Sequence, residues 1–357
     1  MNTKPLLLSL LLAGSSFLYG CNTETSNEPQ DKAKDALTIY TTVYPLEDFT
    51  KKIGGEHVDV QSVYPPGVEA HTFEPTPKTM KQLADSDAFI YIGEGMEGFV
   101  DHAIKTLQNE NVKLVEGAKG VDLLHSDHGL HINHEDEHEH ETNEEAHEHD
   151  HEQEHGGTES AHEEEHAHEN TEEAPGEEHN HYHGDKDPHV WLDPFLSIII
   201  AQNIKNALVE LKPEAKDTFE KNFAAVKKDL QELDQQFQEA IKVAAKKEIL
   251  VSHAAYGYWE KRYGIKQLSV SGLSPTNEPS QKQLTKIIQT ARDHDIQYVI
   301  FEQNITPKIA EIVRNEIGAE VLYLHNLESL TDEDIKNSKD YFTIMKENLE
   351  TLKKALN

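Results

Sequence analysis

The chain has 357 residues, of which 66 are Asp or Glu and 33 are Lys or Arg, so its formal net charge is −33 at pH 7. Residues 125–185 alone hold 22 acidic and no basic residues, which leaves −11 for the rest of the chain. This distribution argues against a nucleic-acid partner, and the single cysteine, Cys21, excludes a disulfide within the chain.

The N-terminus has the pattern of an export signal. Lys4 gives a positive start, residues 6–17 are apolar, and the segment is too short for a permanent membrane span. The Leu-Tyr-Gly-Cys sequence that ends at Cys21 resembles a bacterial lipobox, which implies cleavage before Cys21 and lipid attachment to its thiol; the alternative is a plain secretory signal with an incidental cysteine. We expect residues 1–20 to be a signal peptide and residues 21–35 a lipidated tether at the extracytoplasmic face of the cell membrane.

Residues 36–124 alternate between strand-like and helix-like segments. The strand-like segments are rich in β-branched and aromatic residues and cover residues 37–43, 57–63, 87–92 and 112–115. Helices are expected between them at residues 44–53, 76–84 and 97–109. This alternation predicts a βα lobe with a mostly parallel sheet, which residues 184–211 complete with a helix that follows Asp193-Pro194.

A long helix is expected next, over residues 212–245. It contains no internal Gly or Pro after residue 213, and its apolar residues recur at helical spacing. At 1.5 Å per residue it would be roughly 50 Å long, which indicates a rigid link between two lobes. A second βα series follows in residues 246–357, with strands expected at 248–252, 297–301 and 320–324 and helices at 254–263, 280–294, 306–318 and 338–356. The predicted fold class is α/β, with two Rossmann-like βα lobes joined by this helix.

A His/Glu-rich run at residues 125–183 interrupts the first lobe and contains 16 of the 23 histidines. Imidazole and carboxylate groups at this density indicate binding of a divalent transition metal. The run shows no apolar periodicity, so we expect a disordered loop without fixed ligand geometry. It contains three HExxH strings, at 134–138, 151–155 and 162–166, but none has the apolar helix face that a metalloprotease needs, so no enzyme is expected.

Three motifs outside the run each place a histidine just after or at the end of an apolar strand and before a helix start. They are PPGVEAHTFEP with His71, DPHVWLDP with His189 and VSHAAYGY with His253. The carboxyl ends of parallel strands are where ligands bind in such sheets. Three histidines at this topological position therefore make one shared site a stronger hypothesis than three separate structural histidines.

These motifs resemble those of the zinc-specific substrate-binding proteins of bacterial ABC importers, from about Leu37 to the C-terminus. The resemblance implies two lobes joined by a rigid helix with the metal between them, and His-rich insertions are a family trait. It also implies that His71 and His189 are ligands from the first lobe and His253 from the second. The manganese-binding relatives have Glu at the position of His253, so a histidine there favours zinc.

The fourth ligand is predicted to be Glu328, which follows the last strand of the second lobe; Glu302 or a water molecule is the alternative. Three imidazoles and one carboxylate suit four-coordinate Zn²⁺, although Cu²⁺ or Ni²⁺ would bind at least as tightly. Such a closed set lacks the open position of a catalytic zinc, which favours holding the ion. Asp193 and Glu74 are candidates for orienting the ligand histidines, with a helix cap as the other role for Asp193.

The expected function is capture of Zn²⁺ and its delivery to an ABC permease and ATPase by a monomer anchored through Cys21. The alternatives are a surface zinc buffer or adhesin with the same site, and a carrier of manganese or another divalent metal. The His-rich run would then gather, buffer or sense zinc beside the main site.

Overall fold

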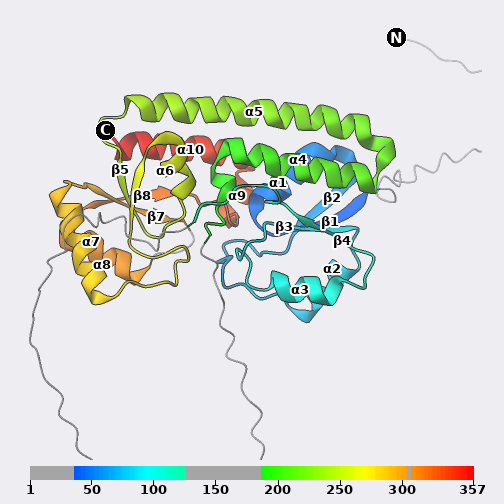
Figure 1. The fold of residues 1–357 in the computed structure, drawn as a ribbon, viewed down its shortest axis with the longest axis horizontal. Coiled ribbons are helices and arrows are strands. Elements are labelled where there is room, and N and C mark those ends of the chain that lie inside the picture. Colours follow the sequence, from blue (N-terminus) through cyan, green and yellow to red (C-terminus); the bar gives the residue numbers. More distant parts are fainter. Residues whose placement is uncertain (1–35, 126–185, 304–306) are drawn as a thin grey trace, which may run out of the picture. The chain divides into compact units, whose positions relative to one another are not determined.

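The computed structural model describes residues 36–125, 186–303 and 307–357. The predicted signal peptide, the tether with Cys21 and nearly all of the His-rich run lie outside these residues. The described residues between Leu37 and Asn357 form one compact unit, in which two parallel α/β lobes follow each other along the chain (Figure 1).

The first lobe contains a four-stranded parallel sheet with the strand order β2-β1-β3-β4. Its strands are β1 (Leu37–Thr41), β2 (Val58–Ser62), β3 (Ala88–Tyr91) and β4 (Lys113–Glu116). Its helices are α1 (Tyr44–Gly54), α2 (Pro77–Ala84), α3 (Val100–Leu107) and α4 (Pro194–Leu211). Thr76 caps α2 and Asp193 caps α4, in each case with a side-chain oxygen that accepts backbone N–H groups of the first turn.

Helix α5 (Lys216–Val243) follows a short 3₁₀ turn at Pro213–Ala215 and has 28 residues. At 1.5 Å per residue it is about 42 Å long. It runs along both lobes at the top of Figure 1 and buries one stripe of apolar side chains, which includes Phe219, Leu230 and Phe237. The helix is shorter than the sequence predicts because Pro213 begins a 3₁₀ turn and the backbone at Ala244 is extended.

The second lobe repeats the arrangement with the strand order β6-β5-β7-β8, again all parallel. Its strands are β5 (Glu248–Val251), β6 (Lys266–Ser269), β7 (Tyr298–Glu302) and β8 (Glu320–Leu324). Its helices are α6 (Gly257–Tyr263), α7 (Gln281–Asp293), α8 (Lys308–Ile317), α9 (Asp332–Lys336) and α10 (Tyr341–Ala355). Strand β6 and helix α9 are absent from the sequence prediction, because β6 reads Lys-Gln-Leu-Ser and α9 has only five residues.

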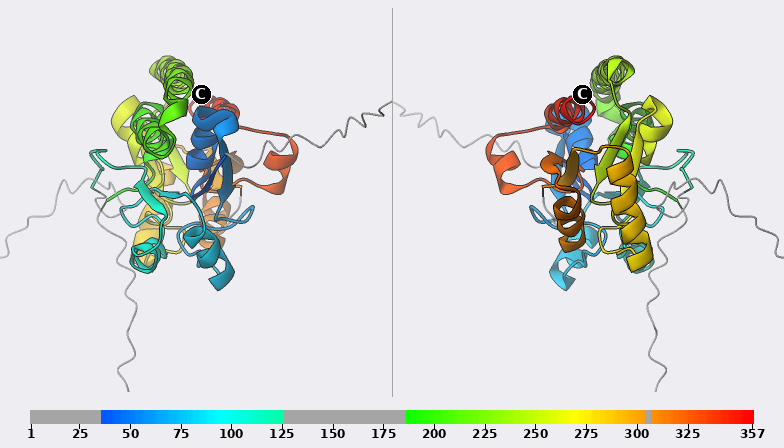
Figure 2. Two further views of the ribbon diagram at one scale, coloured as in Figure 1. Left: turned by 90° about the vertical axis from the view of Figure 1, so that its right-hand side faces the viewer. Right: turned by 90° about the vertical axis from the view of Figure 1, so that its left-hand side faces the viewer.

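One continuous apolar core runs through both lobes on the side of α5 and α10, which lie at the top of both views in Figure 2. It includes Trp191 from the first lobe, Phe237 from α5, and Trp259 and Tyr341 from the second lobe. A smaller separate core lies beneath α7 and α8. The shared core fixes the two sheets relative to each other within this unit. Among the helices in the described ranges, none has the length and apolar character needed to cross a bilayer.

Candidate metal centre

The loop after β2 carries His71 and is held by a neighbouring carboxylate. Glu69 accepts the backbone N–H of His71 (3.0 Å) and that of Thr72 (2.9 Å). Gly67 has a φ of 72°, which favours glycine, and its N–H donates to the carbonyl of Leu330 in the second lobe (2.8 Å). The loop is therefore fixed at both its glycine turn and its histidine.

His189 lies in the segment between the His-rich run and α4, and the second lobe holds this segment from outside. Tyr258 donates its hydroxyl to the carbonyl of Asp187 (2.7 Å), and Trp259 donates its indole N–H to the carbonyl of Leu192 (2.6 Å). The Oδ1 atom of Asp187 lies 2.8 Å from Nδ1 of His189 and also accepts the His189 backbone N–H (2.9 Å). The imidazole is thus oriented with Nε2 facing away from Asp187.

His253 follows β5 and faces a carboxylate from the adjacent strand. Its Nδ1 lies 2.6 Å from Oε1 of Glu302, at the end of β7. The Ser252 hydroxyl donates to the same oxygen (3.0 Å). Because Glu302 lies on the Nδ1 side of the ring, Nε2 of His253 is left for another ligand.

Glu328 lies in the loop after β8, which contacts both lobes. Its backbone N–H donates to Oδ1 of Asn326 (3.1 Å), and its carbonyl accepts the N–H of Tyr44 at the start of α1 (3.1 Å). The carbonyl of Asn326 accepts the indole N–H of Trp191 (2.8 Å). The loop is therefore fixed against the segment that carries His189.

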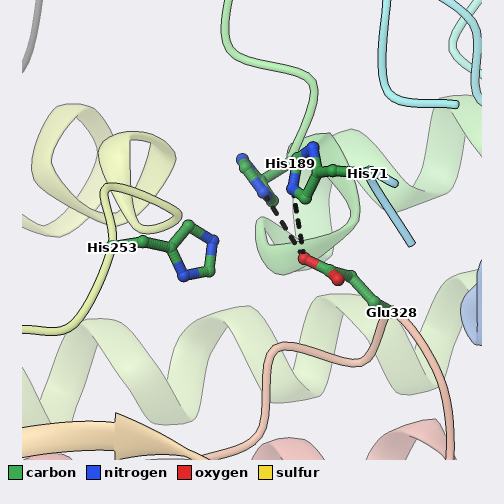
Figure 3. A group of neighbouring side chains, drawn as sticks. All are labelled: His71, His189, His253 and Glu328. Atoms are coloured by element: carbon green, nitrogen blue, oxygen red, sulfur yellow. Dashed lines mark ion pairs between the residues drawn. The ribbon is translucent and has the colours of Figure 1, made fainter. Parts of the chain in front are cut away.

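These four side chains converge on one point, as Figure 3 shows. One ligand atom from each of His71, His189, His253 and Glu328 lies within 4.8 Å of all the others. Oε1 of Glu328 is 3.5 Å from Nε2 of His71 and 3.7 Å from Nε2 of His189. Four ligands at 2.0–2.2 Å in a tetrahedron are about 3.4 Å apart, so these two pairs are already near the spacing that a zinc ion needs. Small inward movements would bring the remaining pairs to the same spacing.

The chemistry of the group fits a metal ion. The exposed fractions of the four residues lie between 0% and 5%. Within the described part of the chain, Nε2 of His189, Nε2 of His253 and Oε1 of Glu328 are buried without a hydrogen-bond partner. Buried polar atoms are nearly always paired, so three that converge on one point indicate a missing electrophile such as a divalent cation.

The charges of the histidines and of Glu328 shift each other's pKa. Burial alone would lower the pKa of His189, but the hydrogen bond to Asp187 and the nearby Glu328 carboxylate outweigh it and raise the pKa to about 9. Burial opposes the charge of Glu328 as well, but His71 and His189 lower its pKa well below the ordinary value. A proton on His189 and the negative charge of Glu328 therefore stabilise each other.

The structure brings together the four residues that the sequence prediction favours, and it places Glu302 behind His253 rather than within the group. Asp193 caps α4 and does not hydrogen-bond a ligand histidine among the described contacts, and Glu74 is exposed. The carboxylate beside His189 is Asp187, which the sequence analysis does not assign. Its position two residues before the histidine, in the same motif, is the signal that could have identified it.

The fold and this group define a class: a two-lobed parallel α/β protein with one buried set of three imidazoles and one carboxylate able to hold a metal ion. The sequence matches the family described as zinc-uptake complex component A periplasmic (ZnuA) over residues 39–355. The chain belongs to this family.

Individual relatives agree with this assignment. The high-affinity zinc uptake system protein ZnuA of Bacillus subtilis is 35% identical over 349 residues, which cover 97% of each chain. The zinc-binding protein AdcA of Streptococcus pyogenes serotype M3 is 33% identical over 354 residues; this match spans 98% of the present chain but only 61% of AdcA. The crystal structure of the Zn(II)-bound ZnuA-like domain of Streptococcus pneumoniae AdcA superposes with a TM-score of 0.66 at 31% identity and covers 90% of this chain and 99% of that one.

Proposed function

We propose that this chain captures one Zn²⁺ ion with His71, His189, His253 and Glu328 and delivers it to an ABC-type importer. The observation that carries the proposal is the convergence of four buried ligand atoms within 4.8 Å. Three neutral imidazoles and one carboxylate suit tetrahedral Zn²⁺, with bonds of about 2.0–2.2 Å. Relatives named for zinc binding and zinc uptake support zinc as the cargo.

Two carboxylates outside the ligand set would orient the ligand rings. Asp187 faces Nδ1 of His189 and Glu302 faces Nδ1 of His253, and each directs the opposite nitrogen, Nε2, toward the ion. Such carboxylate–histidine pairs fix the tautomer and raise the basicity of the ligating nitrogen. In this proposal Glu302 supports a ligand and is not itself the fourth ligand.

The proposed site holds its cargo and does not transform it. Four protein side chains complete a tetrahedral sphere and leave no position for a reactive water molecule, unlike a catalytic zinc site. The same donor set also binds Cu²⁺ or Ni²⁺ tightly, so selectivity depends on geometry and on metal supply.

The proposal gives each part of the chain a role. Residues 36–124 and 184–211 form the first metal-binding lobe, residues 212–245 the linking helix and residues 246–357 the second lobe. Residues 125–183 are an accessory loop that gathers zinc, and His125 and Lys186, which pair in an antiparallel bridge, place both ends of this run beside each other. Residues 1–20 export the protein, and a lipid on Cys21 anchors the monomer outside the cytoplasm, where a permease and its ATPase receive the ion.

The first test separates the proposed site from the His-rich run. Zinc stoichiometry and affinity are measured by metal analysis and competition titration on the full chain, on a version lacking residues 126–185, and on both with His253→Ala. We expect the shortened protein to retain one tightly bound zinc and to lose it with His253→Ala. A shortened protein that folds and binds no stoichiometric zinc would contradict the proposed site.

A second test separates delivery from the alternative of a surface buffer or adhesin, which would use the same site. Zinc uptake by cells in zinc-poor medium is compared between the parent strain and strains carrying His253→Ala or Cys21→Ala. Loss of uptake with His253→Ala supports delivery. Unchanged uptake with a protein that no longer binds zinc would exclude it.

A further inference from the structure

The direction in which Glu328 points depends on an unusual backbone conformation just before it. Leu327 has a φ of 62°, in the left-handed region that side chains other than glycine, asparagine and aspartate rarely adopt. For a leucine this conformation is less stable than the ordinary helical region. Leu327 is fully buried, so its neighbours must impose this conformation.

Two side chains supply the necessary constraints. Nδ1 of His325 accepts the backbone N–H of Leu327 (2.9 Å), and Oδ1 of Asn326 accepts the backbone N–H of Glu328 (3.1 Å). Each side chain thus binds an N–H two residues later and bends the chain toward the three ligand histidines. Because Nδ1 of His325 accepts, its proton lies on Nε2, which is 3.2 Å from Oδ2 of Asp334.

The His325 ring and backbone are themselves fixed. Asn348 on α10 accepts the backbone N–H of His325 and donates to its carbonyl, both at 2.8 Å. Asp334 is held by Thr331, which caps α9, and by Lys339 at 3.2 Å. His325, Asp334 and Asn348 are all buried, so the imidazole has little freedom to turn.

We propose that His325 is a positioning residue for metal binding: it holds Leu327 in the left-handed conformation and thereby directs the Glu328 carboxylate at the ion. The inference rests on the proposed function, in which Glu328 is a zinc ligand. His325 itself contacts neither the proposed ion nor a ligand side chain in the interactions described; it acts through the backbone of Leu327.

Two substitutions separate the contacts of the imidazole. His325→Asn keeps an acceptor in the place of Nδ1 and loses the contact with Asp334, whereas His325→Gln places an amide near Nε2 and loses the acceptor for Leu327. We expect His325→Gln to lower zinc affinity about 10- to 100-fold, the loss typical when a group that orients a metal ligand is removed. We expect the zinc affinity of His325→Asn to stay close to that of the parent protein. Both variants should lower the melting temperature of the metal-free protein.

The experiment measures zinc affinity by competition titration and, with Co²⁺ as a probe, the visible absorption that reports coordination number and ligand geometry. We expect His325→Gln, but not His325→Asn, to change the Co²⁺ spectrum. Both variants are then combined with Glu328→Ala, where His325→Gln should cause no further loss of affinity, since its effect passes through Glu328.

Equal losses of affinity in the Asn and Gln variants with unchanged spectra would overturn the positioning role and leave His325 a residue of loop stability. An undiminished effect of His325→Gln in the Glu328→Ala background would overturn it as well. A different result would contradict the proposed function. If Glu328→Ala alone left the zinc affinity at the parental value, Glu328 would not be a zinc ligand.

Discussion

The two lobes have the same strand order, and in each a hydroxyl after the first strand donates to a buried carboxylate, yet only one of these carboxylates faces a proposed ligand. In the first lobe, Thr42 follows β1 and donates its hydroxyl to Glu97 (2.5 Å). In the second lobe, Ser252 follows β5 and donates its hydroxyl to Glu302 (3.0 Å). The backbone registers agree, because Thr42 and Ser252 each donate an N–H to an isoleucine carbonyl of the adjacent strand.

The difference lies in what else each carboxylate binds. Glu97 also accepts the N–H groups of Ile92 (2.8 Å) and Gly93 (3.1 Å), so its oxygens are used within the first lobe, and burial raises its pKa. Glu302 instead faces His253, which occupies the position after Ser252 where the first lobe has Val43. Both lobes thus contain a buried carboxylate that accepts a hydroxyl. The residue after the hydroxyl donor, Val43 or His253, decides whether that carboxylate also faces a proposed ligand.

The largest expected effect comes from removing the ligand that distinguishes the lobes. His253→Ala should weaken zinc binding by about 100-fold or more, because four-ligand zinc sites have binding free energies of roughly 10–16 kcal/mol and one ligand supplies a substantial share. Competition titration measures the change. The control is His294→Ala, which replaces an exposed histidine of the same lobe. An equal loss of zinc affinity in this control would contradict the proposed site.

The second prediction concerns pH, because the first lobe supports its ligand with Asp187 rather than with a strand-end carboxylate. The pKa of His189 is raised to about 9, so zinc must displace its proton below that pH. Apparent zinc affinity should therefore rise by up to about tenfold per unit between pH 6.5 and 8 through this one proton. In the metal-free protein the same shift contributes stability that is full below pH 6.5 and is lost as the pH rises through about 9.

Titration calorimetry in buffers of different ionisation enthalpy counts the released proton. Asp187→Asn removes the charge that raises the pKa of His189 and should flatten the dependence of affinity on pH. A parental protein whose zinc affinity does not change across this range would show that His189 binds without losing a proton.

The third prediction exchanges the two buried carboxylates for amides. Glu302→Gln should lower zinc affinity about 10- to 100-fold, because a carboxylate that orients a ligand ring is lost. Glu97→Gln should leave zinc affinity unchanged but lower the free energy of unfolding by about 1–3 kcal/mol, since an amide cannot satisfy both backbone N–H donors and the Thr42 hydroxyl. Zinc titration and chemical unfolding on both variants measure the two effects. A larger loss of zinc affinity in Glu97→Gln than in Glu302→Gln would contradict the different roles of the two carboxylates.

The smallest expected effect comes from the hydroxyl donors. Ser252→Ala should lower zinc affinity only a few-fold, as Glu302 keeps its contact with His253. Thr42→Val should leave zinc affinity unchanged and cost about 1 kcal/mol of stability for one lost hydrogen bond. The same two measurements apply, and a larger zinc effect in Thr42→Val than in Ser252→Ala would contradict the assignment.

Much of the fold could be predicted from the sequence, because long periodic segments such as α5 and buried strands such as β3 have strong local patterns. Strand β6 was not predicted, because an edge strand of four residues needs few apolar side chains and forms through its hydrogen bonds to β5. The second-lobe helices α7 and α10 were predicted with small errors at their ends, where capping decides the boundary.

Some residues of the candidate site could also be predicted from the sequence, and others could not. His71, His189 and His253 stand in short motifs, so sequence could select them. The sequence also favoured Glu328 over Glu302 as the fourth ligand, because Glu328 follows the last strand of the second lobe. What the sequence could not show is that Glu302 faces the Nδ1 side of the His253 ring. His325 had no sequence signal, since its role depends on the backbone conformation of Leu327.

The four-ligand site is tested most directly by an anomalous difference map at the zinc absorption edge, from crystals of the protein loaded with one equivalent of zinc. We expect the strongest peak about 2.0–2.2 Å from a nitrogen each of His71, His189 and His253 and from an oxygen of Glu328. A strongest peak elsewhere, or one coordinated by Glu302 in place of Glu328, would contradict this site.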